Sequence, residues 1–256
     1  MKNPRHLRPP LTSAQGFFSY YAKMKQNEGE KITCVQVGAN DGKSNDPIYP
    51  YLQRGDWKGI LLEPQVDVFE NGLKQTYKDH KNVILENAAL AKKSGALPFY
   101  RIAISKARWA TGLSSFDKST LERHIDIGYI EEKAKEDGIK LPENKKDLIE
   151  TVMVPTLTFE DLLKKHHVQN FQLLCVDTEG YDFEIIKLLD FNKFKPEVIF
   201  FESKHLSDSD FVAAQKLLIE NGYELFWEKG DTLAIRCEYP AYMALYHKIR
   251  AIIKKL

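Results

Sequence analysis

Acidic residues follow three separate apolar runs in this chain. Glu63 follows the first run, Asp177 and Glu179 follow the second, and Glu202 follows the third. Ligands of open parallel sheets bind beyond the carboxyl ends of the strands, so we expect these carboxylates to surround one pocket. A carboxylate can accept hydrogen bonds from hydroxyl groups or accept a proton, so the pattern indicates diol recognition or general base chemistry.

The loop Gly38-Ala39-Asn40-Asp41-Gly42 lies after the first apolar strand. Its two glycines permit a tight turn and close backbone approach to a ligand. The spacing differs from the GxGxxG of dinucleotide sites, and the Asp41 carboxylate would repel a pyrophosphate but tolerate an ammonium or sulfonium group. Glu63 lies 25 positions after Gly38 (63 − 38), near the ~20-residue offset of a ribose-binding acid. These residues favour S-adenosylmethionine as cofactor, and a surface acid before Pro64 is the alternative for Glu63.

Further candidates follow the later strands. Asn87 and Ala88 follow the third strand, where they are expected to lie along the edge of an adenine ring. Asp177, Glu179 and His205 are the candidate catalytic residues, because each can accept a proton from an acceptor hydroxyl. Helix capping is the alternative role for the two acids, and a purely structural role is the alternative for the histidine.

Alternating strands and helices must position these residues. A helix is expected to begin at Pro47 with Asp46 as its cap, and residues 228–231 are typical of a hairpin turn. The pattern predicts an α/β fold, with a mostly parallel seven-stranded sheet, an antiparallel last strand and helices on both faces. The seven expected strands are 32–37, 59–62, 83–85, 173–176, 198–201, 223–227 and 232–236.

The predicted domain organisation has three parts. Residues 1–30 form an N-terminal lead-in, residues 31–238 form the main domain, and residues 239–256 form a C-terminal amphipathic helix. Residues 96–150 break the alternation and are interpreted as an insertion that forms a substrate wall or lid.

Three residues of this insertion are candidates for binding the acceptor substrate. Trp109, beside Arg108, could stack on a sugar ring, and Ser114 and Ser115 could hydrogen-bond the acceptor. A partly buried lid residue and an ordinary turn are the respective alternatives.

Composition excludes several classes of protein. The 256 residues carry a net charge of +1, which gives no support for nucleic-acid binding. No apolar run of ~18 residues or secretory signal is present, so a cytoplasmic protein is expected. The basic amphipathic helix 239–256 either docks on the body or makes peripheral contact with an anionic inner-membrane face. Cys34, Cys175 and Cys237 form no CxxC pair and are expected to be reduced thiols. The oligomeric state stays open.

No metal site is expected from the sequence. His166 and His167 are adjacent and do not share a helix face, since only residues three or four apart do so. Asp177, Asp182 and Glu202 would bind a divalent ion only if the fold brought them together.

The chain resembles the FkbM-type S-adenosylmethionine-dependent methyltransferases over roughly residues 31–205. The resemblance rests on the segments 35–42, 62–64, 86–90, 112–115 and 176–182, above all on the Asp-x-Glu-Gly run that begins at Asp177. It implies a Rossmann-like class I methyltransferase fold and O-methylation, commonly of sugar or polyketide hydroxyls.

The resemblance also implies roles for individual residues. The methionine part of the cofactor would lie against Gly38, Asn40 and Gly42. Its ribose would bind Glu63, and its adenine would lie by Asn87 and Ala88. The methyl-transfer site would be bordered by Asp177 and Glu179. Many relatives carry an acid where this chain has Gln36, and Asp41 is the candidate substitute for the ammonium contact.

The leading hypothesis is an O-methyltransferase that acts on a small-molecule or glycan acceptor. An NAD-type oxidoreductase on the same architecture and a scaffold at a membrane surface are the alternatives. The sequence does not identify the acceptor or the position that is methylated.

Overall fold

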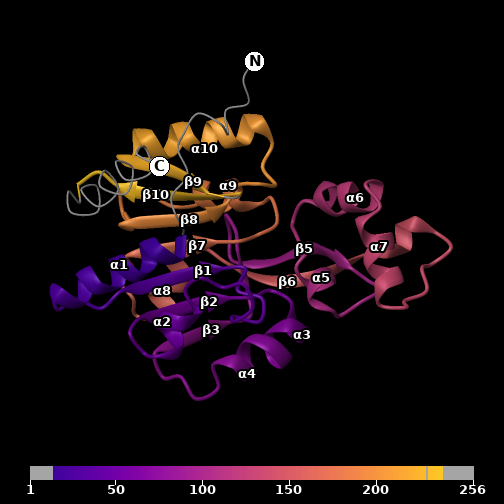
Figure 1. Cartoon of the computed structure of the whole chain (residues 1–256), viewed down its shortest axis with the longest axis horizontal. Coiled ribbons are helices and arrows are strands. Elements are labelled where there is room, and N and C mark those ends of the chain that lie inside the picture. Colours follow the sequence, from indigo (N-terminus) through magenta and orange to yellow (C-terminus); the bar gives the residue numbers. More distant parts are fainter. Residues whose placement is uncertain (1–13, 229, 239–256) are drawn as a thin grey trace, which may run out of the picture.

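A computed structural model describes residues 14–228 and 230–238 of the chain. Its main sheet has seven strands in the order β3-β2-β1-β7-β8-β10-β9 (Figure 1). The pairs from β3 to β8 are parallel, and β10 is antiparallel to both of its neighbours. The predicted mostly parallel sheet with an antiparallel last strand is confirmed. The strands are β1 (Thr33–Val37), β2 (Lys58–Leu62), β3 (Val83–Glu86), β7 (Leu173–Val176), β8 (Val198–Glu202), β9 (Tyr223–Glu228) and β10 (Asp231–Arg236).

Alternate residues of the central strands pack against opposite layers of helices. In β1, Cys34 belongs to one buried cluster and Val35 to the other, as the two-residue period of a strand requires. The cluster of Cys34 contains apolar residues of α1 (Ala14–Asn27), α2 (Tyr49–Gln53) and the helical segment 66–76. That segment comprises α3 (Val66–Val68), a π-helical turn (Phe69–Leu73) and α4 (Lys74–Thr76).

The cluster of Val35 contains apolar residues of three other helices. These are α8 (Phe159–Lys165), α9 (Asp182–Lys187) and α10 (Asp208–Glu220). The predicted helices on both faces of the sheet are therefore confirmed.

A smaller region lies to one side of the main sheet and has its own core (Figure 1). It contains a second sheet of order β4-β6-β5. It spans residues 89–157 and thus includes the expected insertion 96–150. The elements of this region are β4 (Ala89–Leu90), β5 (Gly95–Ile102), α5 (Arg108–Thr111), α6 (Lys118–Asp126), α7 (Tyr129–Glu136), a 3₁₀ turn (Lys145–Leu148) and β6 (Ile149–Leu157).

Two details of the expected helices differ in the structure. Helix α2 begins at Tyr49 and not at Pro47, because Pro50 lacks an N–H group and suits the first turn of a helix. The N-cap residue is Ile48 and not Asp46, although Asp46 Oδ1 accepts from the backbone N–H groups of Ile48 and Tyr49 at 2.8 and 3.2 Å.

The N-terminal lead-in holds helix α1, whose residues Phe17, Phe18 and Tyr21 are buried against the sheet. The expected C-terminal amphipathic helix, residues 239–256, lies outside the described residues. Within residues 14–228 and 230–238, no helix combines the length and apolar character needed to span a bilayer.

Candidate active site

Two adjoining cavities lie at the carboxyl ends of the parallel strands. Both are lined by Gly38, Asn40, Arg108, Asp177 and Glu179. The sequence analysis expected four of these five residues at the site, and it named Arg108 as a neighbour of Trp109. The fold therefore brings together side chains that are up to 141 positions apart in the sequence (179 − 38).

The glycine loop approaches the strand-β7 loop very closely. Gly38 has φ +82°, and a Cβ atom there would lie 1.8 Å from the carbonyl oxygen of Asp177. Only glycine fits this position, both because of its left-handed backbone and because of the space available. The tight turn predicted from the sequence therefore holds the β1 and β7 loops together.

Glu63 lines the first cavity at the end of β2, with only 3% of its surface exposed. Its Oε2 accepts from the backbone N–H of Asn40 at 3.0 Å, and its Oε1 accepts from that of Gln65 at 2.9 Å. Burial raises the pKa of Glu63 from 4.5 to about 7, although these hydrogen bonds act in the opposite direction. Two backbone donors thus fix a buried carboxyl group at the cavity wall.

Apolar side chains form part of the wall of the first cavity. Ala88 and Leu90 line it after β3, and Phe116 closes it from the smaller region. Ser114 and Ser115 line the same cavity, and Ser114 Oγ accepts from Gln65 Nε2 at 2.9 Å. The wall of the first cavity therefore combines the Glu63 carboxyl group with apolar side chains.

The second cavity is lined by charged side chains from β7, β8 and their loops. It contains Asp177 and Glu179 from the β7 loop, and Glu202 and Lys204 from β8 and the loop after it. Desolvation in the cleft, and then the carboxylates of Glu202 and Glu179, raise the pKa of Asp177 well above its usual range. The side chain of Asp177 still opens onto the cavity, and no hydrogen bond to its carboxylate is found within the described part of the chain.

Asp182 holds the loop that carries these acids. It is fully buried, and its Oδ2 accepts from Thr178 Oγ1 at 3.1 Å and from the backbone N–H of Gly180 at 3.3 Å. Burial, followed by the charge of Glu202, raises the pKa of Asp182 to about 8. Its position between helix α9 and residues 178–180 fixes the turn in which Glu179 adopts φ +51°.

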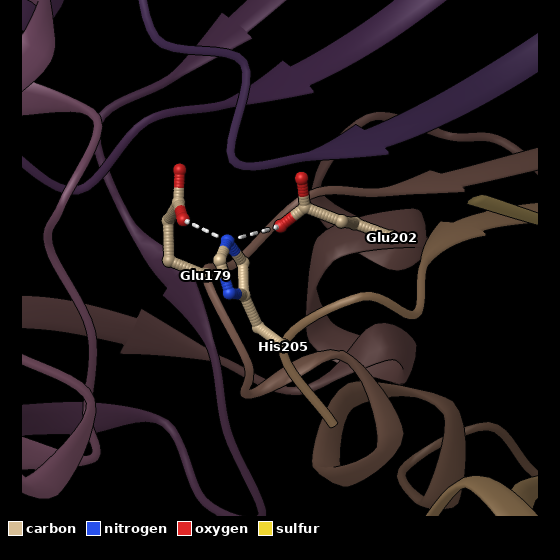
Figure 2. Close-up of side chains that lie close together, drawn as sticks. All are labelled: Glu179, Glu202 and His205. Atoms are coloured by element: carbon tan, nitrogen blue, oxygen red, sulfur yellow. Dashed lines mark ion pairs between the residues drawn. The ribbon is translucent and has the colours of Figure 1, made fainter. Parts of the chain in front are cut away.

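His205 lies between two carboxylates, as Figure 2 shows. Its Nε2 is 3.3 Å from Oε2 of Glu179 and 3.6 Å from Oε2 of Glu202. The ring of His124 in α6 packs edge-on against the His205 ring, with centroids 5.6 Å apart. This cluster borders the second cavity, because both glutamates line it.

Several residues expected at the site lie apart from both cavities. The Asp41 carboxylate accepts from the backbone N–H groups of Lys43 and Ser44 at 3.0 and 2.9 Å, within its own loop. Gly42 packs against the ring of Tyr77, where a Cβ atom would be 2.7 Å away. Trp109 donates through Nε1 to Asp137 at 2.7 Å.

Asn87 also lies outside the residues that line the cavities. Its Nδ2 donates to the backbone carbonyls of Glu63 and Pro64 at 2.8 and 3.2 Å. It therefore supports the residue that lines the first cavity.

The sequence analysis did not single out some residues that build the site. Gln65 donates both to Glu63 and to the smaller region, where it reaches the Thr111 carbonyl at 2.9 Å. Phe116 and Tyr181 line the first cavity with their rings 5.4 Å apart. No local pattern marks these residues, because their partners are distant in sequence.

Comparison with known proteins gives a consistent result. The model of the methyltransferase FkbM domain matches residues 36–225. No curated protein matched the sequence.

Several solved structures are similar to this chain at low sequence identity. Methyltransferase FkbM from Methylobacillus flagellatus KT is 11% identical with a TM-score of 0.47, over 80% of this chain and 43% of that chain. Precorrin-6y C5,15-methyltransferase from Geobacter metallireducens GS-15 is 10% identical with a TM-score of 0.41, over 88% and 90% of the two chains. An O-methyltransferase from Bacillus cereus, in complex with SAH, is 10% identical with a TM-score of 0.43, over 88% and 82%. The present chain thus spans less than half of the Methylobacillus protein.

Proposed function

The chain belongs to the FkbM methyltransferase family, and on that premise we propose that it is an O-methyltransferase for a hydroxyl of a sugar, glycan or related small molecule. Its sheet is that of a class I methyltransferase, and S-adenosylmethionine is the methyl donor. The match favours methyl transfer over the oxidoreductase alternative. The membrane-scaffold alternative depends on residues 239–256, which lie outside the described residues.

The residues of the first cavity suit an adenosyl group. The buried carboxyl group of Glu63 has lone pairs left for ribose hydroxyls after it accepts the N–H groups of Asn40 and Gln65. The apolar lining at Ala88, Leu90 and Phe116 suits a flat base such as adenine. The fixed position of Glu63 is the observation that carries this proposal.

The two cavities meet where a donor and an acceptor would react. S-adenosylmethionine bound in the first cavity would supply an electrophilic methyl group on positively charged sulfur. Gly38, Asn40 and Glu179 line both cavities, so they border the path from the first cavity to the acceptor side. Holding the two reactants in line supplies much of the rate acceleration.

Asp177 is placed to take the proton of the acceptor hydroxyl. It lines both cavities, and its carboxylate has no hydrogen-bond partner within residues 14–228 and 230–238. An alcohol is a weak nucleophile until it loses its proton, so a base at this position completes the site. Ser114, Ser115 and Arg108 come from the smaller region and form the wall that faces the strand ends.

Calorimetry with S-adenosylhomocysteine tests this proposal directly. The wild-type protein should bind one equivalent, and Glu63→Ala should weaken binding by about 100-fold, because the substitution also leaves two buried N–H groups without an acceptor. Glu70→Ala, which removes an exposed helical acid paired with Lys74, is the matched control. No binding by the wild type, or equal binding by the Glu63 variant, would contradict the proposal. A screen of methyl transfer to nucleotide sugars, lipid-linked glycans and small alcohols then identifies the acceptor.

A further inference from the structure

Three potential ligand atoms converge at the edge of the second cavity. Nε2 of His205 and one carboxylate oxygen each of Glu179 and Glu202 all lie within 4.8 Å of one another. Glu179 lies in the loop after β7, Glu202 is the last residue of β8, and His205 lies in the loop after β8. Figure 2 shows that both carboxylates are directed toward the ring nitrogen.

One of these atoms is buried without a partner. Glu202 has 8% of its surface exposed, and its Oε2 makes no hydrogen bond. The other oxygen, Oε1, is paired with the ammonium of Lys204. A buried charged oxygen without a partner costs several times more free energy than a bonded one. The atom is aimed at His205 and Glu179, so a ligand in the middle of the cluster would satisfy it.

Direct hydrogen bonds between His205 and the two carboxylates do not account for the cluster. The distances from its Nε2 are 3.3 Å to Glu179 and 3.6 Å to Glu202. Both exceed the ~2.7–2.9 Å of a charge-assisted hydrogen bond. Donor atoms that share a metal ion at ~2.0–2.2 Å lie about 3.0–3.6 Å apart when the angle between them is from 90° to about 110°. The two separations fall in this range.

The surrounding charges also favour a cation. Asp177 lines the same cavity as Glu179 and Glu202, so three carboxyl groups meet there. Buried Asp182 has its pKa raised by burial and by Glu202. The positively charged side chains nearby are Lys204, which is paired with Glu202, and Arg108, which lines the cavity. The ring of His124 packs edge-on against that of His205, with centroids 5.6 Å apart.

We propose that Glu179, Glu202 and His205 bind a divalent cation of the Mn²⁺ or Mg²⁺ class at the acceptor side of the cleft. Two of the three ligand atoms are carboxylate oxygens, which this class of cation prefers. Three protein ligands leave coordination positions open for the acceptor. The sequence analysis expected no metal, and the set that it considered was Asp177, Asp182 and Glu202, of which only Glu202 belongs to the proposed site.

The role of the cation rests on the proposed methyltransferase function. A cation beside the acceptor hydroxyl lowers the pKa of that hydroxyl, so its proton passes more readily to Asp177. It also orients an acceptor that carries two neighbouring hydroxyls, since both can bind the open positions. Acceptors with a vicinal diol are therefore expected to be favoured over monohydroxy alcohols.

Direct binding of Mn²⁺, followed by the electron paramagnetic resonance signal of the free ion, tests the site without any methyl transfer. The full chain, first freed of metal with a chelator, should bind one Mn²⁺. The substitution Glu202→Gln should weaken this binding by at least about tenfold, because the loss even of an outer-shell partner costs a metal site 10–100-fold. The matched control Glu220→Gln removes an exposed acid at the end of α10 and should bind Mn²⁺ like the wild type.

Two further measurements make the outcome decisive. His205→Ala must also weaken Mn²⁺ binding, and it serves as the principal variant if Glu202→Gln does not fold. Calorimetry with S-adenosylhomocysteine is done on the same samples, because its failure would contradict the proposed function and leave the metal result valid. Absence of Mn²⁺ binding by the wild type, or equal binding by both site variants, overturns the metal proposal.

Discussion

The two cavities of the cleft are built from different kinds of groups. In the first, backbone N–H groups of Asn40 and Gln65 satisfy both oxygens of Glu63. In the second, Glu202 is the last residue of strand β8 in the same sheet, but its Oε2 has no hydrogen-bond partner. The first cavity is therefore complete before any ligand binds, whereas the second contains charges that a ligand must balance.

This difference indicates that the first cavity recognises the cofactor and that the second takes part in the reaction. Backbone donors are fixed by the fold, so a carboxyl group that they hold can select a neutral diol without rearrangement. Carboxylates that lie close together repel one another, so the second cavity favours binding of a cation or a proton. Variants that change one cavity and leave the other intact can therefore test whether the two cavities have separate roles.

The largest effect is expected at the junction of the two cavities, for Asp177→Asn. The amide cannot accept the proton of the acceptor hydroxyl, so kcat should fall by about 10²–10⁴-fold, as for loss of a general base. Binding of S-adenosylhomocysteine should stay within about threefold of the wild type, since the first cavity keeps its backbone donors. Steady-state kinetics and calorimetry measure the two quantities. A variant that keeps more than a tenth of the activity would show that Asp177 is not the base.

The next largest effect is expected for Gly38→Ala, which tests how far backbone geometry builds the first cavity. The added Cβ would lie 1.8 Å from the Asp177 carbonyl oxygen, so the two loops must separate. Gly55→Ala is the matched control, because Gly55 also has a positive φ (+76°) but open space around it. The control should lose about 1–2 kcal/mol of unfolding free energy, and Gly38→Ala about 1–3 kcal/mol more. Equal losses in urea unfolding would refute the close approach of the loops.

A pH effect on stability follows from the burial of Glu63. Its pKa is about 7 in the folded chain and 4.5 without burial, so the folded state holds the proton where the unfolded state has lost it. The stability contribution of this proton is complete below pH 4.5 and is lost as the pH rises to 7, by about 3 kcal/mol in total. Urea unfolding of the ligand-free protein at pH 5 and pH 7 measures the change. Between pH 5 and pH 7 this proton accounts for about 2 kcal/mol, so Glu63→Gln, which cannot titrate, should show a drop smaller by that amount, and an identical drop would contradict the assignment.

The smallest effect is expected for Arg108→Ala in the wall that faces both cavities. Arg108 Nη2 donates to the Ser44 carbonyl at 3.0 Å, and Nη1 lies 3.5 Å from Asp41. Loss of this exposed contact should raise the KM of the acceptor by about 3–10-fold with little change in kcat, which corresponds to about 1 kcal/mol. Lys106→Ala, on an exposed neighbouring residue, is the control. A larger change in kcat than in KM would place Arg108 in the chemical step.

The sequence by itself determined the sheet and the residues at the ends of its strands. Apolar runs fix where strands form, and the connection of parallel strands brings their carboxyl ends to one edge, so Gly38, Glu63 and Asp177 could be placed at the cleft from their positions alone.

Only the tertiary structure decided which side chains face one another. The sequence gives no distance between Glu179, Glu202 and His205. Their meeting depends on the shape that Asp182 gives the β7 loop and on the contact of that loop with His205 after β8. It likewise does not show that Asp41 turns back onto its own loop. Local pattern governs backbone structure, whereas the direction of a side chain depends on packing between segments far apart in the chain.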